Sequence, residues 1–136
     1  IRTELQDASV CREEWKDSAD VVLCDVPCSG LGIIRKKPEI RFKNPDEIRT
    51  LPEIQAKILA NCAQYVKKGG TLVYSTCTIL QRENEDVVRA FLTENPEFEA
   101  VSWTHPVCGE RADGMVPLLP PVHNTDGFFI AKMHRK

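Results

Sequence analysis

Four consecutive apolar residues, 21–24, lie between Asp20 and Asp25. A short apolar run of this kind predicts a strand buried on both faces, as in a parallel sheet that helices cover. The residues that follow, 25–32, are rich in Pro, Ser and Gly and predict a loop after the strand. This strand restricts the fold more than any other segment, because it favours proteins built on a helix-covered parallel sheet.

A long helix is predicted downstream of this loop. Asn44, followed by Pro-Asp-Glu, indicates a helix start with a cap, a proline in the first turn and acids near the positive end. The main helix is expected from Pro52 to Lys67, with Gly69 ending it. Its buried face is predicted from apolar residues at helical spacing, which are Ile54, Ile58, Leu59, Cys62, Ala63 and Val66.

Three more strands and a second helix are predicted after Gly69. The β-branched and aromatic segment 71–76 predicts a strand, and helical spacing of apolar residues predicts a helix over 82–94. Alternation of apolar and polar residues predicts strands over 98–103 and 127–134. The segment 105–125 is rich in Pro and Gly and is expected to be an extended loop.

This order of elements predicts an α/β fold with a mostly parallel sheet. The last strand has no helix before it, so we expect it to form an antiparallel edge. The 136 residues contain no internal repeat and fit a single domain, 1–136.

The net charge of −2 excludes binding to nucleic acid through bulk positive charge, so any basic site must be local. No run approaches the roughly 20 apolar residues that span a bilayer, and no signal segment opens the sequence. We therefore expect a cytoplasmic protein. The six cysteines contain no C-x-x-C pair and are expected to be reduced thiols, with no bound metal.

A zinc site is the alternative interpretation of four of these residues. Cys24 and Cys28, with His105 and Cys108, are ligands of the right type. This alternative is disfavoured because Cys24, inside the predicted strand, would have to point the same way as a loop cysteine.

Two cysteines are expected at the edge of the sheet where the strands end. Cys28 follows the first predicted strand and Cys77 follows the second, so neighbouring strands would bring them together with Asp25 alongside. We interpret these two cysteines as functional. Cys24 and Cys62 are instead expected to be small buried hydrophobic residues.

A short basic segment stands out in the acidic chain. Its five positive charges surround one aromatic residue and suit contact with an RNA backbone and stacking on a base. The alternative is a solvated basic loop. The candidate RNA-binding residues are Arg35, Lys36, Lys37, Arg41, Phe42 and Lys43.

Several segments resemble one known family. The loop 25–32 with residues 35–40, and the segment 69–78, resemble two signatures of the Sun (Fmu, RsmB-type) ribosomal RNA cytosine-C5 methyltransferases. Glu83-Asn84-Glu85 and the closing segment 126–132 are also similar to that family. Val26 and Phe42 depart mildly from its usual alanine and tryptophan.

The resemblance implies a Rossmann-like fold and methyl transfer from S-adenosylmethionine to C5 of cytosine in RNA. The expected substrate is 16S ribosomal RNA in a bacterial cytosol. It also implies that Cys77 is the nucleophile, adding to C6, and that Cys28 assists product release. The reverse assignment stays open, because DNA cytosine methyltransferases use a Pro-Cys nucleophile, which Cys28 would match.

The same resemblance implies roles for two acids and a proline. Asp25 is expected to bond the cytosine edge, and with Pro27 to lie at the cofactor pocket. Asp7 resembles the acid that contacts the adenosine part of the cofactor. The alternatives are a strand-end cap for Asp25 and a solvated loop acid for Asp7.

The glycine-rich cofactor loop of the family is not present in these 136 residues, nor is an RNA-binding module. We therefore expect the carboxyl-terminal half of a catalytic domain, with most of the cofactor site outside it. Association with a second copy or with an amino-terminal half is expected. Two other classes stay open, a non-catalytic RNA-binding or assembly module and a thiol redox protein.

The isolated chain is expected to have little or no methyltransferase activity, because it contains the thiol chemistry without most of the methyl-donor site. A methyl-transfer assay on the purified 136 residues with RNA checks this expectation. Turnover by the chain alone would contradict it.

Overall fold

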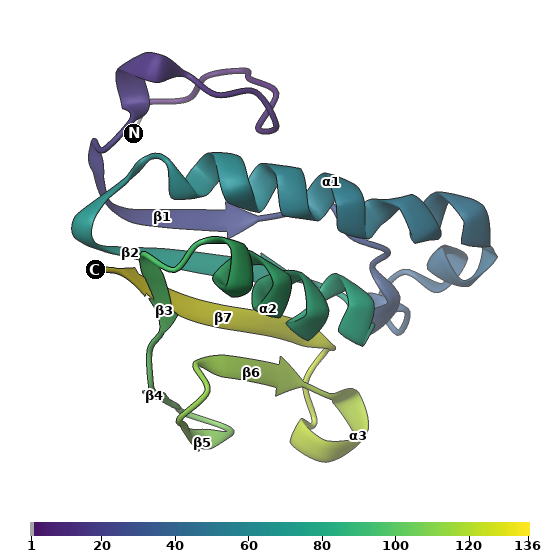
Figure 1. Cartoon of the computed structure of the whole chain (residues 1–136). Coiled ribbons are helices and arrows are strands. Elements are labelled where there is room, and N and C mark those ends of the chain that lie inside the picture. The colour runs from purple at the N-terminus through teal and green to yellow at the C-terminus, as the bar shows by residue number, and fades with distance from the viewer. Residues whose placement is uncertain (1) are drawn as a thin grey trace.

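The computed structural model describes residues 2–136 and has one five-stranded sheet at its centre (Figure 1). The strand order is β1-β2-β7-β3, and β6 also pairs with β7. The bounds of these strands are Ala19–Asp25 for β1, Val66–Thr76 for β2, Phe98–Ala100 for β3, Met115–Leu118 for β6 and Phe128–Arg135 for β7.

Four of the five strands run in the same direction. β1 pairs with β2 in parallel, and β7 pairs antiparallel with β2, β3 and β6, so β7 alone is reversed. The predicted α/β class with a mostly parallel sheet is confirmed. The prediction that the reversed strand forms an edge is wrong, because β3 and β6 pair with the outer side of β7.

Two helices, α1 (Pro45–Ala63) and α2 (Glu85–Glu94), cover one face of this sheet (Figure 1). The core between helices and sheet includes fully buried Leu59, Leu72, Tyr74 and Phe129. The smaller elements are α3 (Pro120–His123) and a hairpin of β4 (Trp103–His105) with β5 (Gly109–Arg111). In the part of the chain that the structure describes, no helix is long and apolar enough to cross a membrane.

The prediction that the first strand is buried on both faces is wrong. Cys24 is buried under α1, but Val21 and Leu23 are 64% and 67% exposed. β1 is an edge strand, and its alternate side chains face the side of the sheet that α1 and α2 leave uncovered. The apolar run therefore predicted the strand correctly. It did not predict correctly that both faces of the strand are covered.

The first helix begins and ends earlier than predicted. The Asn44 side chain accepts a hydrogen bond from the Asp46 N–H at 3.0 Å, so the predicted cap starts α1 at Pro45 and the helix passes through Pro52. The helix ends at Ala63 because the carbonyls of Gln64 and Tyr65 accept hydrogen bonds from residues 17–19. β2 consequently begins at Val66, and Gly69 lies inside it rather than ending the helix.

The later boundaries also differ from the predictions. The second helix starts with a 3-10 turn, Gln81–Glu83, before α2. The predicted strand 98–103 is divided into β3 and β4. The predicted loop 105–125 contains β5, β6 and α3. The strand β6 was not predicted because it contains Pro117. Proline is nevertheless tolerated in β6, because this strand pairs on one side only.

Gly32 holds the loop after β1 against the start of β7. Its N–H donates to the Cys77 carbonyl at 3.0 Å, and its own carbonyl accepts from the Gly127 N–H at 2.8 Å. A Cβ at position 32 would lie 2.6 Å from the carbonyl carbon of Gly127. The two chain segments can approach this closely because both positions are glycine.

We predict that Gly32→Ala destabilises the chain by about 3 kcal/mol, because backbone atoms must move to admit the methyl group. Urea unfolding of the chain measures this change. Gly109→Ala is the control, since a Cβ there meets nothing within 4 Å and only the positive φ of 73° opposes it. The control should cost about 1–2 kcal/mol. Equal losses in both variants would contradict the proposed close approach.

Candidate active site

Cys28 and Cys77 lie in contact at the carboxyl ends of two parallel neighbours. Asp25 of β1 is opposite Ser75 of β2, so both strands end at the same edge of the sheet. The two Sγ atoms are 3.2 Å apart, and the Cys77 N–H donates to Cys28 Sγ at 3.3 Å. The structure therefore brings together the two thiols that the sequence placed after successive strands.

The environment of Cys28 favours its protonated form. Burial, followed by the hydrogen bond to Cys77, raises the pKa of the Cys28 thiol to about 12. At neutral pH Cys28 therefore keeps its proton and can donate it in the hydrogen bond between the two sulfur atoms. In this arrangement the Cys77 sulfur is the acceptor.

The two thiols open into a hollow of about 360 Å³. Charged residues occur on its wall, and Lys43 Nζ donates to the Ser29 carbonyl at 2.8 Å, beside Cys28. Sequence reasoning missed Glu39 as part of this wall, because residues 31–42 fold back through two 3-10 turns that no periodic pattern marks. The residues that line the hollow are Cys28, Gly30, Ile33, Lys37, Glu39, Ile40, Lys43 and Cys77.

Buried hydroxyl groups join the two cysteine loops. Ser29 Oγ and Thr78 Oγ1 are 2.7 Å apart, and both residues are fully buried. Asn84 accepts from the Thr76 hydroxyl at 2.6 Å and donates to the Thr78 carbonyl at 3.0 Å. Each cysteine is therefore followed by a residue whose side chain is fixed by hydrogen bonds inside the protein.

The residues of the basic segment lie in three different environments. Arg35 and Lys36 form ion pairs with Asp126, and these cations hold the pKa of that carboxyl below its ordinary value. Lys37 and Lys43 line the hollow. The Arg41 guanidinium lies 4.9 Å from the centre of the Phe42 ring, and Phe42 is 77% exposed.

The family model described as 16S rRNA methyltransferase RsmB/F matches residues 3–134. The chain belongs to the RsmB/F family. It is 43% identical over its whole length to the probable ribosomal RNA small subunit methyltransferase B of Bacillus subtilis, covering 32% of that protein. It is 40% identical to the small subunit methyltransferase B of Thermus thermophilus, covering 88% of this chain and 30% of the relative. The chain thus spans about a third of the length of these relatives.

Solved structures share the fold of this chain. One crystal structure matches with a TM-score of 0.87 and 37% identity, covering 96% of this chain and 30% of the other. NSun6 from Pyrococcus horikoshii, determined with SFG, matches with a TM-score of 0.70 and 27% identity. That match covers 83% of this chain and 29% of NSun6.

The segments that resemble the RsmB/F signatures meet at one place in the fold. The loop after β1 contacts the loop after β2 through the cysteines and through Ser29 and Thr78. Residues 83–85 come shortly after the loop that follows β2. The segment Asp126-Gly127 reaches the same edge of the sheet through the hydrogen bond between Gly127 and Gly32. Signatures that are about 100 residues apart in sequence therefore meet at one edge of the sheet.

Asp25 lies beside this hollow in the RsmB/F chain but does not line it. Its side chain is exposed and accepts a hydrogen bond from the Ser75 hydroxyl at 2.8 Å. Pro27 is also exposed, and its carbonyl accepts from the Gln55 amide at 3.0 Å. Both residues remain at the strand ends, between the sheet edge and the thiols.

Asp7 is not brought to the thiols. Its exposed carboxylate accepts from the Ser9 N–H and hydroxyl at 2.9 and 2.7 Å, and these bonds lower the pKa of Asp7. The neighbouring Ala8 carbonyl accepts from Asn61 in the last turn of α1, at the opposite end of the sheet from Cys77 (Figure 1). The structure therefore places Asp7 as a solvated loop acid.

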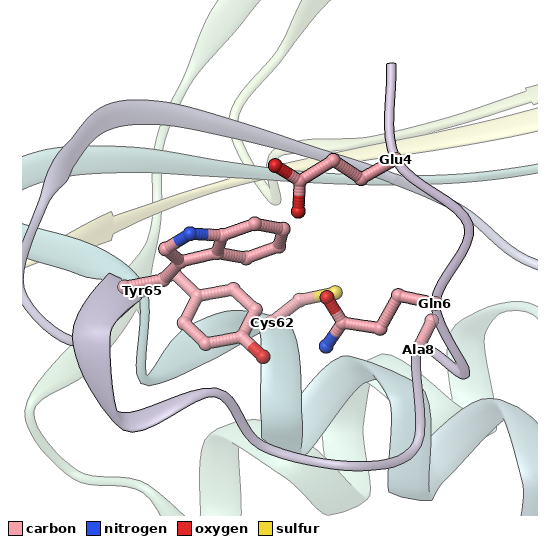
Figure 2. A pocket seen from close by; sticks show the side chains of 6 residues that line it. Glu4, Gln6, Ala8, Cys62 and Tyr65 are labelled. Atoms are coloured by element: carbon pink, nitrogen blue, oxygen red, sulfur yellow. The ribbon is translucent and has the colours of Figure 1, made fainter. Parts of the chain in front are cut away.

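The segment around Asp7 closes a second hollow of about 190 Å³, separate from the thiol site (Figure 2). It lies between the amino-terminal segment and the end of α1, where Trp15 packs edge-on against Tyr65. Its lining residues are Glu4, Gln6, Ala8, Trp15, Cys62 and Tyr65.

Cys24 lies in the core, and Cys62 is half-buried on the wall of the second hollow. The hydrogen bond to Cys62 and burial raise the pKa of Cys24, which faces α1. Cys24 therefore packs in the core between β1 and α1. Within residues 2–136 no cluster of three or more His, Cys, Asp or Glu side chains could hold a metal ion.

We predict that alkylation of Cys28 in this RsmB/F chain keeps accelerating well above pH 9, about tenfold per pH unit, because its thiolate stays scarce. A small thiol levels off near its own pKa. The rates are measured with iodoacetamide and peptide mass spectrometry between about pH 7 and about pH 10.

Cys77→Ala is the matched variant for this measurement. Because burial is the larger cause, the variant should lower the pKa of Cys28 but leave it above the ordinary 9.0. A Cys28 alkylation rate that levels off near pH 9 in the wild-type chain would contradict a raised pKa of Cys28.

Proposed function

We propose that this chain carries the thiol chemistry of an S-adenosylmethionine-dependent enzyme that methylates C5 of cytosine in 16S ribosomal RNA, in the cytoplasm. The observation that supports the proposal most directly is the 3.2 Å contact between Cys28 and Cys77 in a chain of the RsmB/F family. Reactions at C5 need a nucleophile that adds and later leaves, and a second group that assists its departure. Two thiols in contact can supply these two groups.

The proposed reaction starts with Cys77. C5 of cytosine is too weakly nucleophilic to accept a methyl group directly. Addition of the Cys77 thiolate to C6 forms a carbon–sulfur bond and makes C5 an enamine carbon, which can attack an electrophilic methyl group. Loss of the C5 proton to a base then restores the double bond as the carbon–sulfur bond breaks, and Cys77 leaves as a thiolate.

The proposed role of Cys28 follows from its protonation. The pKa of about 12 keeps its proton in place at neutral pH, so its S–H can donate to the Cys77 sulfur while negative charge returns there. This hydrogen bond stabilises the departing thiolate and favours release of the methylated base. The reverse assignment, with Cys28 as nucleophile, would need a thiolate at the thiol whose surroundings oppose ionisation.

The described residues supply part of the surroundings that S-adenosylmethionine would need. Asp25 and Pro27, both exposed at the carboxyl edge of β1, fit a cofactor bound beside the thiols. Asp7 does not fit, because it lies at the other end of the sheet. When bound, the cofactor would supply the methyl group to C5, the methyl–sulfur bond breaking as the new carbon–carbon bond forms and the demethylated thioether leaving. SFG, the S-adenosylmethionine analogue in the NSun6 structure, supports this proposal.

The proposed partner is RNA, bound through the basic segment. Lys37 and Lys43 line the hollow that holds the thiols, and Arg41 and Phe42 present a cation and an aromatic ring next to it. A base inside a duplex cannot reach a half-buried thiol. The target cytosine must therefore be unpaired or flipped out of its helix.

A mechanism-based trap tests the reaction and the role of each thiol. This chain replaces the aligned segment of the Bacillus subtilis relative, and the chimera is mixed with S-adenosylmethionine and 16S-derived RNA that contains 5-fluorocytosine. Fluorine at C5 blocks the final proton loss, so a competent enzyme stays attached. We expect a covalent adduct at Cys77 that Cys77→Ser abolishes. With ordinary RNA, Cys28→Ser should accumulate the same adduct.

Each result of the trap has a distinct meaning. An adduct mapped to Cys28 would keep the enzyme class and reverse the two roles. RNA binding without any adduct would contradict the proposal and favour a non-catalytic RNA-binding module. Mass spectrometry of the digested complex identifies the modified cysteine.

The basic segment yields a second prediction. Arg41→Ala should weaken binding of single-stranded RNA to the chain and reduce the slope of log affinity against log salt by about 0.7. Phe42→Ala should weaken binding by about 1–3 kcal/mol and leave that slope unchanged, because stacking involves no counterion release. Fluorescence anisotropy at several salt concentrations measures both effects.

Lys68→Ala is the control, since Lys68 is an exposed cation near the amino end of β2, away from the thiols. If this variant reduced the salt slope as much as Arg41→Ala, binding would not be local to the basic segment.

A further inference from the structure

Glu83 is a fully buried acid that the proposed reaction does not use. It lies in the 3-10 turn Gln81–Glu83, six residues after Cys77, and the Tyr74 hydroxyl donates to its backbone carbonyl at 2.7 Å. Tyr74 is itself fully buried in β2. Its hydrogen bond therefore ties the backbone of Glu83 to the centre of the sheet. No contact joins the Glu83 carboxylate to either thiol, so any effect it has on the chemistry must act through other residues.

The Glu83 carboxylate holds the loop on both sides of Cys28. Its Oε2 accepts from the Ser29 N–H at 2.8 Å, directly after Cys28. The same oxygen accepts from Gln55 Nε2 at 3.0 Å, and that amide also donates to the Pro27 carbonyl at 3.0 Å, directly before Cys28. The peptide groups that flank Cys28 are therefore both tied to one oxygen, one directly and one through Gln55.

Stability alone is a weak explanation for this arrangement. Glu83 Oε1 and Gln55 Oε1 are buried and accept no hydrogen bond from residues 2–136. A buried carboxylate with an unpartnered oxygen costs free energy that an apolar side chain of similar size would not. What the carboxylate supplies, and an apolar side chain cannot, is an acceptor aimed at the backbone next to Cys28.

We infer that Glu83 is the positioning residue for Cys28: through Ser29 and Gln55 it keeps the Cys28 sulfur in contact with Cys77. This inference rests on the proposed function for its chemical consequence, because Cys28 can stabilise the departing Cys77 thiolate only while the sulfur atoms touch. Glu83 thus acts on the release step and not on the addition step.

The first experiment tests how firmly the Cys28 loop is held, and it requires no catalysis. Iodoacetamide labels the 136-residue chain, and peptide mass spectrometry gives a rate for each cysteine. Glu83→Met removes the acceptor at nearly constant volume, and we expect Cys28 to react about tenfold faster, because its loop opens more often. Glu83→Gln keeps an amide oxygen for both donors and should stay within about threefold of the wild type.

Cys24 reports whether the variant has merely loosened the whole fold. It lies in the core, so a faster Cys24 rate equal to that of Cys28 would indicate global opening and overturn the inference. An unchanged Cys28 rate in Glu83→Met would also overturn it. A Cys28 rate that rises alone, and returns in Glu83→Gln, supports it.

The second experiment measures the release step in the Bacillus subtilis chimera with ordinary RNA. Glu83→Met should still form the Cys77 adduct but release methylated RNA about tenfold more slowly, as Cys28→Ser does, so adduct accumulates. Slower adduct formation with no accumulation would overturn the positioning role. If no adduct forms in any variant, including the wild type, the proposed function fails while the alkylation rates still decide whether Glu83 positions Cys28.

Discussion

In the register of β1 against β2, Asp25 lies opposite Ser75, and the two loops that follow carry Cys28 and Cys77. Parallel pairing makes both strands end at the same edge, so thiols 49 residues apart in sequence meet at 3.2 Å. An antiparallel pairing of these strands would put them at opposite edges. The thiol contact, the hollow beside it and the placement of the basic segment all depend on this one pairing.

The contact between the loops is maintained by polar groups rather than by apolar packing. The Ser29–Thr78 hydroxyl bond, the Glu83 carboxylate and the Gly32–Gly127 approach each join segments that follow different strands. Hydrogen bonds in a buried environment specify direction as well as distance, which apolar contacts do not. The helix-facing core supports the sheet, and this polar layer sets the geometry at its end.

Much of the fold could be predicted from local patterns. The apolar run of β1, the Asn44 cap and the alternation of β7 each act within a few residues, so the elements and the α/β class were recognisable. Long-range effects could not be read in the same way. Pairing of residues 64–66 with the start of β1 ended α1 earlier than predicted, and pairing with β7 turned part of a proline-rich segment into β6. At the site, the thiol contact was predictable because each cysteine follows a strand. Glu39 on the hollow wall and Asp7 at the far end of the sheet were not, since both placements depend on how loops fold back.

The reversed strand β7 has a consequence for the order in which the protein matures during synthesis. It is the strand that joins β2 to β3 and β6, and Gly127, directly before it, braces the loop that carries Cys28. The β2–β7 pairing and the Gly32–Gly127 contact connect segments more than 50 residues apart, and such contacts form late in folding. The ribosome must therefore complete β7 before the thiol loops are secured. Until then the nascent chain has both thiols but lacks the strand and the Gly127 contact that brace the loops carrying them.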